Sequence, residues 1–300
     1  MMNVITTLLS GFQKTLRSGK FVLLAWGVTF ILGIVFAFPI KAGFKRAAGN
    51  SMIFDRIQDG ILIDIFADMG RSFTTIAFMS LSGFLLIMVA GFMVNAFITR
   101  GIFGALRGSG GPVNFSDFFS HSPKNYWSFL GISVLLRFTI LILSLIMIVI
   151  PVSALGPGQS VSTEKTVVVV AVSALCFLFV IPVFILVSDY ARAWQVAHPA
   201  ASFMKSLGSG FSLAFSRFFV SYSYVLMICA MQLAFFLFVF SLMQRWEPSG
   251  PGTFLFVIAV QMVTAAGLFL RYWRFAGVTA LLEQMTPVKY ENVIENEIQS

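Results

Sequence analysis

Six apolar stretches decide what this chain can fold into. A membrane-spanning helix needs about 20 mostly apolar residues, and suitable stretches lie near residues 21–40, 74–98, 128–150, 167–188, 218–243 and 254–270. Each is apolar on all sides, unlike the surface helix of a soluble protein, and none alternates as the strands of a membrane barrel do. The sequence therefore predicts an all-α polytopic protein with six transmembrane helices in a single integral membrane domain, residues 1–300. The last helix is expected to continue towards Glu283.

The composition excludes an ordinary soluble domain. Hydrophobic residues make up 58% of the chain and charged residues 11%, against about 25% charged residues in soluble globular domains. Both cysteines, Cys176 and Cys229, stand in apolar runs, where a thiol behaves as a small hydrophobic group. We interpret both as packing residues.

The first 20 residues carry a basic amphipathic pattern. Lys14, Arg17 and Lys20 are interleaved with apolar residues, and the segment lacks the short apolar core and cleavage site of a signal peptide. A helix of this kind lies in the plane of the membrane surface. The prediction is an interfacial amphipathic helix at residues 1–20.

The distribution of Lys and Arg predicts the orientation, because cytoplasmic loops are enriched in both. With the N-terminus inside, the cytoplasmic segments hold Lys14, Arg17, Lys20, Arg100, Arg107, Lys124, Arg192, Lys205, Arg217, Arg271, Arg274 and Lys289. Both termini are therefore expected in the cytoplasm. The net charge of +8 is expected to meet anionic phospholipid headgroups rather than nucleic acid.

The first outer loop, residues 41–73, is the longest connection and the acidic one. Its aspartates are Asp55, Asp59, Asp64 and Asp68. Asp55 with Asp59, and Asp64 with Asp68, have i,i+4 spacing, and each pair could bind a divalent cation through oxygen ligands. The two pairs, however, point to nearly opposite sides of one helix. The alternative is a solvated acidic face that neutralises nearby Lys and Arg.

Short polar and aromatic segments precede the first, third and fifth spans, at residues 8–14, 115–120 and 203–207. The second, fourth and sixth spans end near Arg100, Arg192 and Arg274. This order predicts three repeats of an interfacial helix followed by a helical hairpin. Alternatively, positive-inside bias and aromatic belts alone produce similar helix ends.

Arg137 is the most informative polar residue, because it stands about ten residues into the third span, where an arginine is costly unless it is paired or reaches the interface. Asp189 is the nearest partner by depth, and an Arg137–Asp189 pair is the favoured interpretation. Asp189 could instead neutralise Arg192 at i+3. A substrate or proton site at Arg137 and a lipid-facing, snorkelling side chain remain open.

The three arginines at the helix ends, Arg100, Arg192 and Arg274, would form a ring if the repeats pack around a common axis. Guanidinium groups bind phosphate through paired hydrogen bonds, so these residues are candidate contacts for an anionic lipid headgroup. Anchoring by positive-inside bias is the simpler alternative.

Motifs of enzymatic chemistry are lacking in the sequence. His121 and His198 have no third ligand at a metal-binding spacing, residues 108–112 lack the lysine of a phosphate-binding loop, and no nucleophile elbow of a serine hydrolase occurs. No cofactor, metal site or enzymatic activity is expected.

Short motifs resemble a known family. They are residues 115–119 (FSDFF) leading to 126–130 (YWSFL), residues 189–192 (DYAR), and residues 270–274 (LRYWR) running to 280–283 (ALLE). They resemble a bacterial family of six-span membrane proteins without an established function, loosely similar to the membrane portions of some glycerophosphodiester phosphodiesterases. The resemblance implies a bacterial cytoplasmic membrane and carries no catalytic assignment, and we expect no soluble phosphodiesterase domain within residues 1–300.

The sequence thus predicts a non-enzymatic membrane component that binds lipids and other membrane protein subunits. The alternative is a transporter or lipid-handling protein with its site near Arg137 and Asp189, beside a kink at Pro182. Sparse charge within the spans favours the first, because ion-coupled carriers usually contain several ionisable groups there.

Overall fold

The computed structural model describes residues 4–48, 70–107, 115–153, 163–244 and 252–285, and every regular element among them is a helix. The helices are α1 (Val4–Arg17), α2 (Gly19–Ala48), α5 (Gly70–Arg107), α6 (Phe115–His121), α7 (Tyr126–Ser144), a π-helical turn η1 (Leu145–Val149), α8 (Ile150–Ser153), α9 (Thr163–Ala197), α10 (Phe203–Ser216), α11 (Phe218–Met243) and α12 (Gly252–Met285). The all-α prediction is confirmed.

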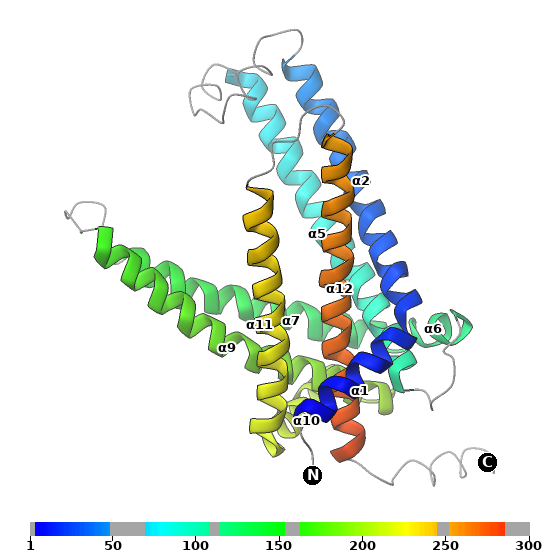
Figure 1. Ribbon diagram of the computed structural model, residues 1–300. Coiled ribbons are helices and arrows are strands. Elements are labelled where there is room, and N and C mark those ends of the chain that lie inside the picture. Colours follow the sequence, from blue (N-terminus) through cyan, green and yellow to red (C-terminus); the bar gives the residue numbers. More distant parts are fainter. Residues whose placement is uncertain (1–3, 49–69, 108–114, 154–162, 245–251, 286–300) are drawn as a thin grey trace. The chain divides into compact units, whose positions relative to one another are not determined.

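Six helical segments are long and apolar enough to cross a membrane (Figure 1). They are Gly19–Phe38, Ser80–Arg107, Tyr126–Ser153, Lys165–Ala197, Phe218–Met243 and Phe254–Met285. The prediction of six spans is confirmed, and the chain is a multi-pass helical membrane protein. The chain divides into two compact units, Met1–Leu23 with Ala96–Ser300, and Leu24–Asn95.

Several helices are longer than predicted. The spans expected to end near residues 98, 188 and 270 continue to Arg107, Ala197 and Met285, and the expected extension of the last helix towards Glu283 is confirmed. The boundaries differ because hydropathy falls at the arginines while the backbone remains helical. Hydropathy marks where lipid contact ends, whereas hydrogen bonding decides where a helix ends.

The outer loop expected at residues 41–73 is shorter at both ends. Helix α2 runs through Pro39 to Ala48, and α5 begins at Gly70. A proline inside a helix removes one backbone hydrogen bond but need not end the helix. The predicted acidic face and cation site, Asp55, Asp59, Asp64 and Asp68, lie outside the described residues.

In the unit Leu24–Asn95, α2 and α5 contact each other through a small residue. The ring of Phe36 lies against Gly83, 3.6 Å from where a Cβ on that glycine would stand. Trp26 stacks on Phe30 one turn further along α2, with ring centroids 5.7 Å apart. Small residues allow membrane helices to approach closely.

In the other unit, α1 and α10 turn small side chains towards the protein and large apolar ones outward. The buried residues recur every four positions, as Thr7, Gly11 and Thr15 in α1 and as Ser206, Gly210 and Ala214 in α10. The exposed ones include Ile5, Leu9 and Leu16 in α1 and Met204, Phe211 and Phe215 in α10. This pattern is the reverse of a water-soluble helix and fits one that lies in lipid.

Each short helix packs on a long helix that precedes it, and α1 packs on the last one (Figure 1). Gly11 of α1 meets Gly277 of α12, and Gly210 of α10 meets Ala191 of α9. Gly101 of α5 lies against Phe118 of α6. Three times, a short helix is followed by two long helical segments, in the order expected for the repeat. The structural equivalence of the three units remains a prediction.

Candidate functional site

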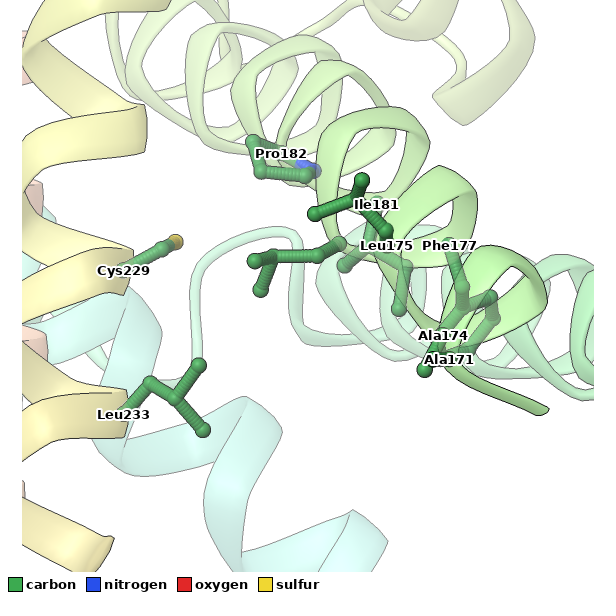
Figure 2. A pocket seen from close by; sticks show the side chains of 9 residues that line it. Ala171, Ala174, Leu175, Phe177, Ile181, Pro182, Cys229 and Leu233 are labelled. Carbon is green, nitrogen blue, oxygen red and sulfur yellow. The ribbon is translucent and has the colours of Figure 1, made fainter. Parts of the chain in front are cut away.

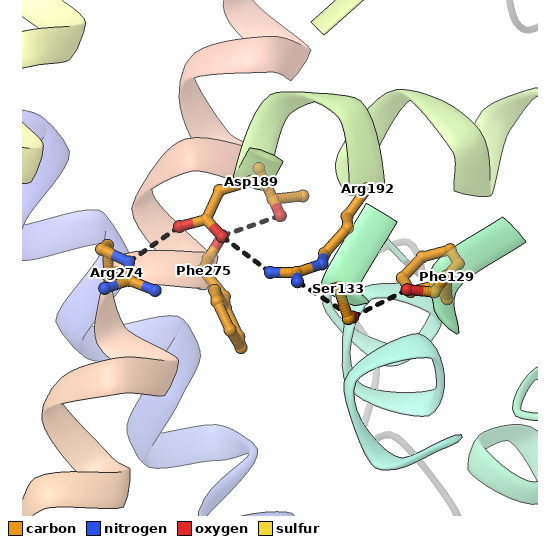
Figure 3. Close-up of polar contacts among 7 residues, drawn as sticks. Phe129, Ser133, Asp189, Arg192, Arg274 and Phe275 are labelled. Carbon is orange, nitrogen blue, oxygen red and sulfur yellow. Dashed lines mark hydrogen bonds and ion pairs between the residues drawn. The ribbon is translucent and has the colours of Figure 1, made fainter. Parts of the chain in front are cut away.

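Asp189 lies at the centre of a buried charged cluster (Figure 3). Its side chain is fully buried, and its two carboxylate oxygens accept hydrogen bonds from two arginines of different helices. Arg192, one turn further along α9, donates from Nη1 over 3.2 Å. Arg274 of α12 donates from Nε over 2.7 Å. One carboxylate therefore joins two helices that lie 85 residues apart in the sequence.

Arg192 extends the cluster to a third helix. Its Nη2 donates to Ser133 Oγ of α7 over 3.1 Å, and Ser133 Oγ donates to the Phe129 carbonyl oxygen one turn earlier over 2.7 Å. Both side chains of this contact are buried. Because the arginine donates in two directions, α7, α9 and α12 are connected through polar contacts rather than apolar packing alone.

Arg100 of α5 reaches the same region through aromatic rings. It is 1% exposed, donates from Nε to the Lys124 carbonyl oxygen over 3.0 Å, and lies 5.4 Å from the centre of the Phe129 ring. The Phe103 ring contacts both Phe129 and Phe275, at centroid distances of 6.3 and 4.8 Å. Arg274 lies over Phe275 at 5.4 Å. The three arginines at the predicted helix ends thus belong to one connected core.

Positive charge exceeds negative charge around Asp189. Arg271 and Arg137, in addition to Arg274, act electrostatically on Arg192, and Arg271 lies over the Phe275 ring at 5.4 Å. Arg192, Arg274 and Arg271 therefore accompany one carboxylate in the described part of the chain, a surplus of two positive charges. A surplus of this kind inside a membrane protein attracts anions strongly, because little solvent screens it.

The structure brings together most of the predicted site residues. The Asp189–Arg192 contact at i+3, which the sequence left as an alternative, is confirmed. The pairing of Arg137 with Asp189 remains a prediction, because the described ion pairs of Asp189 are with Arg192 and Arg274. Arg137 itself is exposed on α7, one turn beyond Ser133.

The predicted ring of arginines is found as a buried core rather than a surface ring. Arg100, Arg192 and Arg274 are 1%, 3% and 8% exposed. Positive-inside anchoring alone does not explain such burial, because an anchoring side chain must reach the headgroups. Contact of these three residues with a lipid headgroup remains a prediction.

Sequence reasoning missed the hydrogen-bonding neighbours of this core. Tyr190 and Ser221 hydroxyl oxygens lie 2.8 Å apart between α9 and α11, and the Tyr224 hydroxyl donates to the Trp273 carbonyl oxygen over 2.7 Å. Gln195 contacts Ser206 of α10. In the sequence, these residues share a polar side chain (Tyr, Ser or Gln) at the depth of the arginines. Single polar residues are frequent near helix ends, so this pattern does not identify them.

The cluster is suited to binding and positioning rather than to proton transfer. Arginine remains protonated and has only donors, so it holds anionic groups but is a poor acid or base. Among the described residues, no group of three His, Cys, Asp or Glu side chains could hold a metal ion. His198 stacks on Trp194 instead, at a centroid distance of 4.0 Å.

Comparisons with known proteins add no functional assignment to this geometry. The resemblance to the bacterial six-span family remains a prediction. No protein-family model, curated protein or solved structure matches the chain significantly.

Proposed function

We propose that this protein is a non-enzymatic component of a bacterial inner membrane that binds anionic lipids and another membrane subunit, with both termini in the cytoplasm. The observation that carries the proposal is how little of each span the rest of the chain covers. In the most apolar window of each span, between 0% and 17% of residues are buried. Membrane helices are held together by packing. The apolar surface that the chain itself does not cover must therefore pack against lipid or a partner subunit.

The short helices support the lipid part of the proposal. Helices α1 and α10 expose large apolar side chains, and exposed basic residues accompany them at Arg17, Lys205 and Arg217. Apolar insertion together with cationic side chains is the combination by which interfacial helices select anionic membranes. Arg100, Arg192 and Arg274 are less suitable for testing surface attraction, because removing them would disturb the buried core.

Lipid retention tests the proposal. We expect wild-type protein in nanodiscs of mixed anionic and zwitterionic phospholipid to be enriched in anionic lipid, as measured by mass spectrometry of the lipids bound after delipidation. Replacing Arg17, Lys205 and Arg217 together with Gln should lower that enrichment, since each charge near an anionic surface contributes about 1 kcal/mol. The control is Lys165→Gln at the opposite end of α9, which should leave it unchanged. Equal retention of both lipid classes by wild type would refute anionic lipid selection.

The surplus positive charge favours a second candidate, a transporter or lipid-handling protein with its site at Arg137 and Asp189. Pro182 lies inside α9, about two turns before Asp189, where a missing backbone hydrogen bond provides a hinge. On this proposal, Arg137→Leu abolishes anion or lipid flux in liposomes while circular dichroism shows a folded protein. If wild-type liposomes show no flux above protein-free liposomes, the second candidate is wrong.

A further inference from the structure

An apolar groove of about 500 Å³ lies between α9 and α11. Its walls include Ala174, Leu178, Ile181 and Pro182 on α9 and Cys229 and Leu233 on α11 (Figure 2). The groove opens to the outside, since Leu175 and Leu233 on its walls are 55% and 39% exposed. Its volume falls in the range of about 300–1,000 Å³ that is typical of small-molecule sites.

Local chemistry explains why the two helices leave space here. Ala171 and Ala174 provide only methyl groups on one wall. Below the groove, the Tyr222 hydroxyl of α11 donates to the Phe179 carbonyl oxygen of α9 over 2.9 Å, within one turn of Pro182. This hydrogen bond and the Tyr190–Ser221 contact hold α9 and α11 together on the side of the groove towards the start of α11.

One end of the groove lies towards the charged cluster. Pro182 lines the groove on α9, and Asp189, which binds Arg274, follows two turns later on the same helix. Arg274 also lies close to Arg271. The groove is therefore apolar along its walls and positively charged beyond one end.

The depth of the charged end matches a lipid headgroup layer. Helix α1, whose exposed side is apolar, lies against α12 beside Arg274, where Trp273 Nε1 donates to the Leu8 carbonyl oxygen over 2.9 Å. An amphipathic helix of this kind lies at the boundary of headgroups and acyl chains. With α1 at that boundary, Arg274 lies near the depth of lipid phosphates, and the groove, two turns and more before Asp189 on α9, lies deeper in the bilayer.

We propose that the groove between α9 and α11 holds one acyl chain of an anionic phospholipid, with the lipid phosphate at Arg274 and Arg271. The inference rests on the proposed lipid-binding function and names its specific site. Apolar walls select the chain, and the unbalanced guanidinium charge selects the anionic head over a zwitterionic one. A neutral lipid or an apolar partner helix would leave that positive charge without a counterion.

Photocrosslinking tests this site. Two phospholipid probes carry the same diazirine in the acyl chain, one with a phosphatidylglycerol head and one with a phosphatidylcholine head, and peptide mass spectrometry maps the adducts in full-length protein. We expect adducts on residues 171–182 and 229–233 to be about tenfold more frequent with the anionic probe, as one charge-assisted contact predicts. Arg271→Gln should reduce this preference.

Matched variants give the control. Ala174→Trp fills the groove and should remove these adducts, whereas Val172→Trp, at an exposed position of the same helix that is not among the groove residues, should leave them unchanged. Equal adducts from both probes, or no groove adducts from either, would overturn the proposal. If anionic lipid is nevertheless enriched in nanodiscs, only this site is wrong and the proposed lipid binding stands. If that enrichment is also missing, the lipid-binding function itself fails.

Discussion

Replacing Asp189 with Asn is expected to destabilise the protein by about 3–5 kcal/mol, the usual effect of removing one partner from a buried ion pair. Asparagine keeps the size of the side chain but not its charge. Arg192 and Arg274, 3% and 8% exposed, would then repel each other without a counterion. Thermal unfolding in detergent, followed by circular dichroism, measures the loss.

A surface ion pair provides the control for Asp189. Lys14 and Glu283 lie 2.7 Å apart, but their side chains are 32% and 42% exposed. Glu283→Gln should therefore change stability by less than about 1 kcal/mol. Adding Arg192→Gln to Asp189→Asn should cost less than the sum of the single changes, because residues in one network are not additive. Similar effects of Asp189→Asn and Glu283→Gln would show that the buried cluster does not stabilise the fold.

The second large effect is expected at Gly210, where α10 crosses α9. A Cβ on Gly210 would lie 2.6 Å from the backbone nitrogen of Ala191, and backbone atoms cannot move aside as a flexible side chain does. Gly210→Ala should therefore force the helices apart and destabilise the protein by about 1–3 kcal/mol. The midpoint of thermal unfolding should fall accordingly.

Gly208 gives a control of opposite sign on the same helix. A Cβ there meets no atom of the described structure within 4 Å. Gly208→Ala should leave packing unchanged and stabilise α10 by about 0.5–1 kcal/mol, because alanine restricts the unfolded chain and favours the helix. If both substitutions shift the unfolding midpoint in the same direction, the close crossing at Gly210 does not determine the stability of this contact.

The two predictions concern the same part of the molecule. Ala191, which Gly210 touches, lies between Asp189 and Arg192 on α9. The small-residue crossing therefore positions the helix segment that carries the charged cluster. Loosening this crossing should also weaken the anionic lipid preference at the groove, since Arg274 is held by Asp189.

The charged cluster shows where sequence reasoning reaches its limit. Asp189 and Arg192 are three residues apart, so their contact follows from helical geometry alone. Arg274 is 85 residues from Asp189, and nothing in its local sequence indicates that it pairs with a buried carboxylate. Because an arginine is also typical of a membrane boundary, the predicted helices ended near these arginines, whereas the helices of the structure continue beyond them.

The sequence by itself determined the helical class and the six spans, because both follow from the length and hydrophobicity of continuous segments. Tertiary structure decided which face of α1 and α10 packs inward, which arginines share Asp189, and where α9 and α11 leave a groove. These features depend on how closely small residues such as Gly11, Gly210 and Ala174 let helices or other groups approach. The distance between two packed helices depends on the residues of both helices. Because these helices are far apart in the sequence, neither helix alone determines that distance.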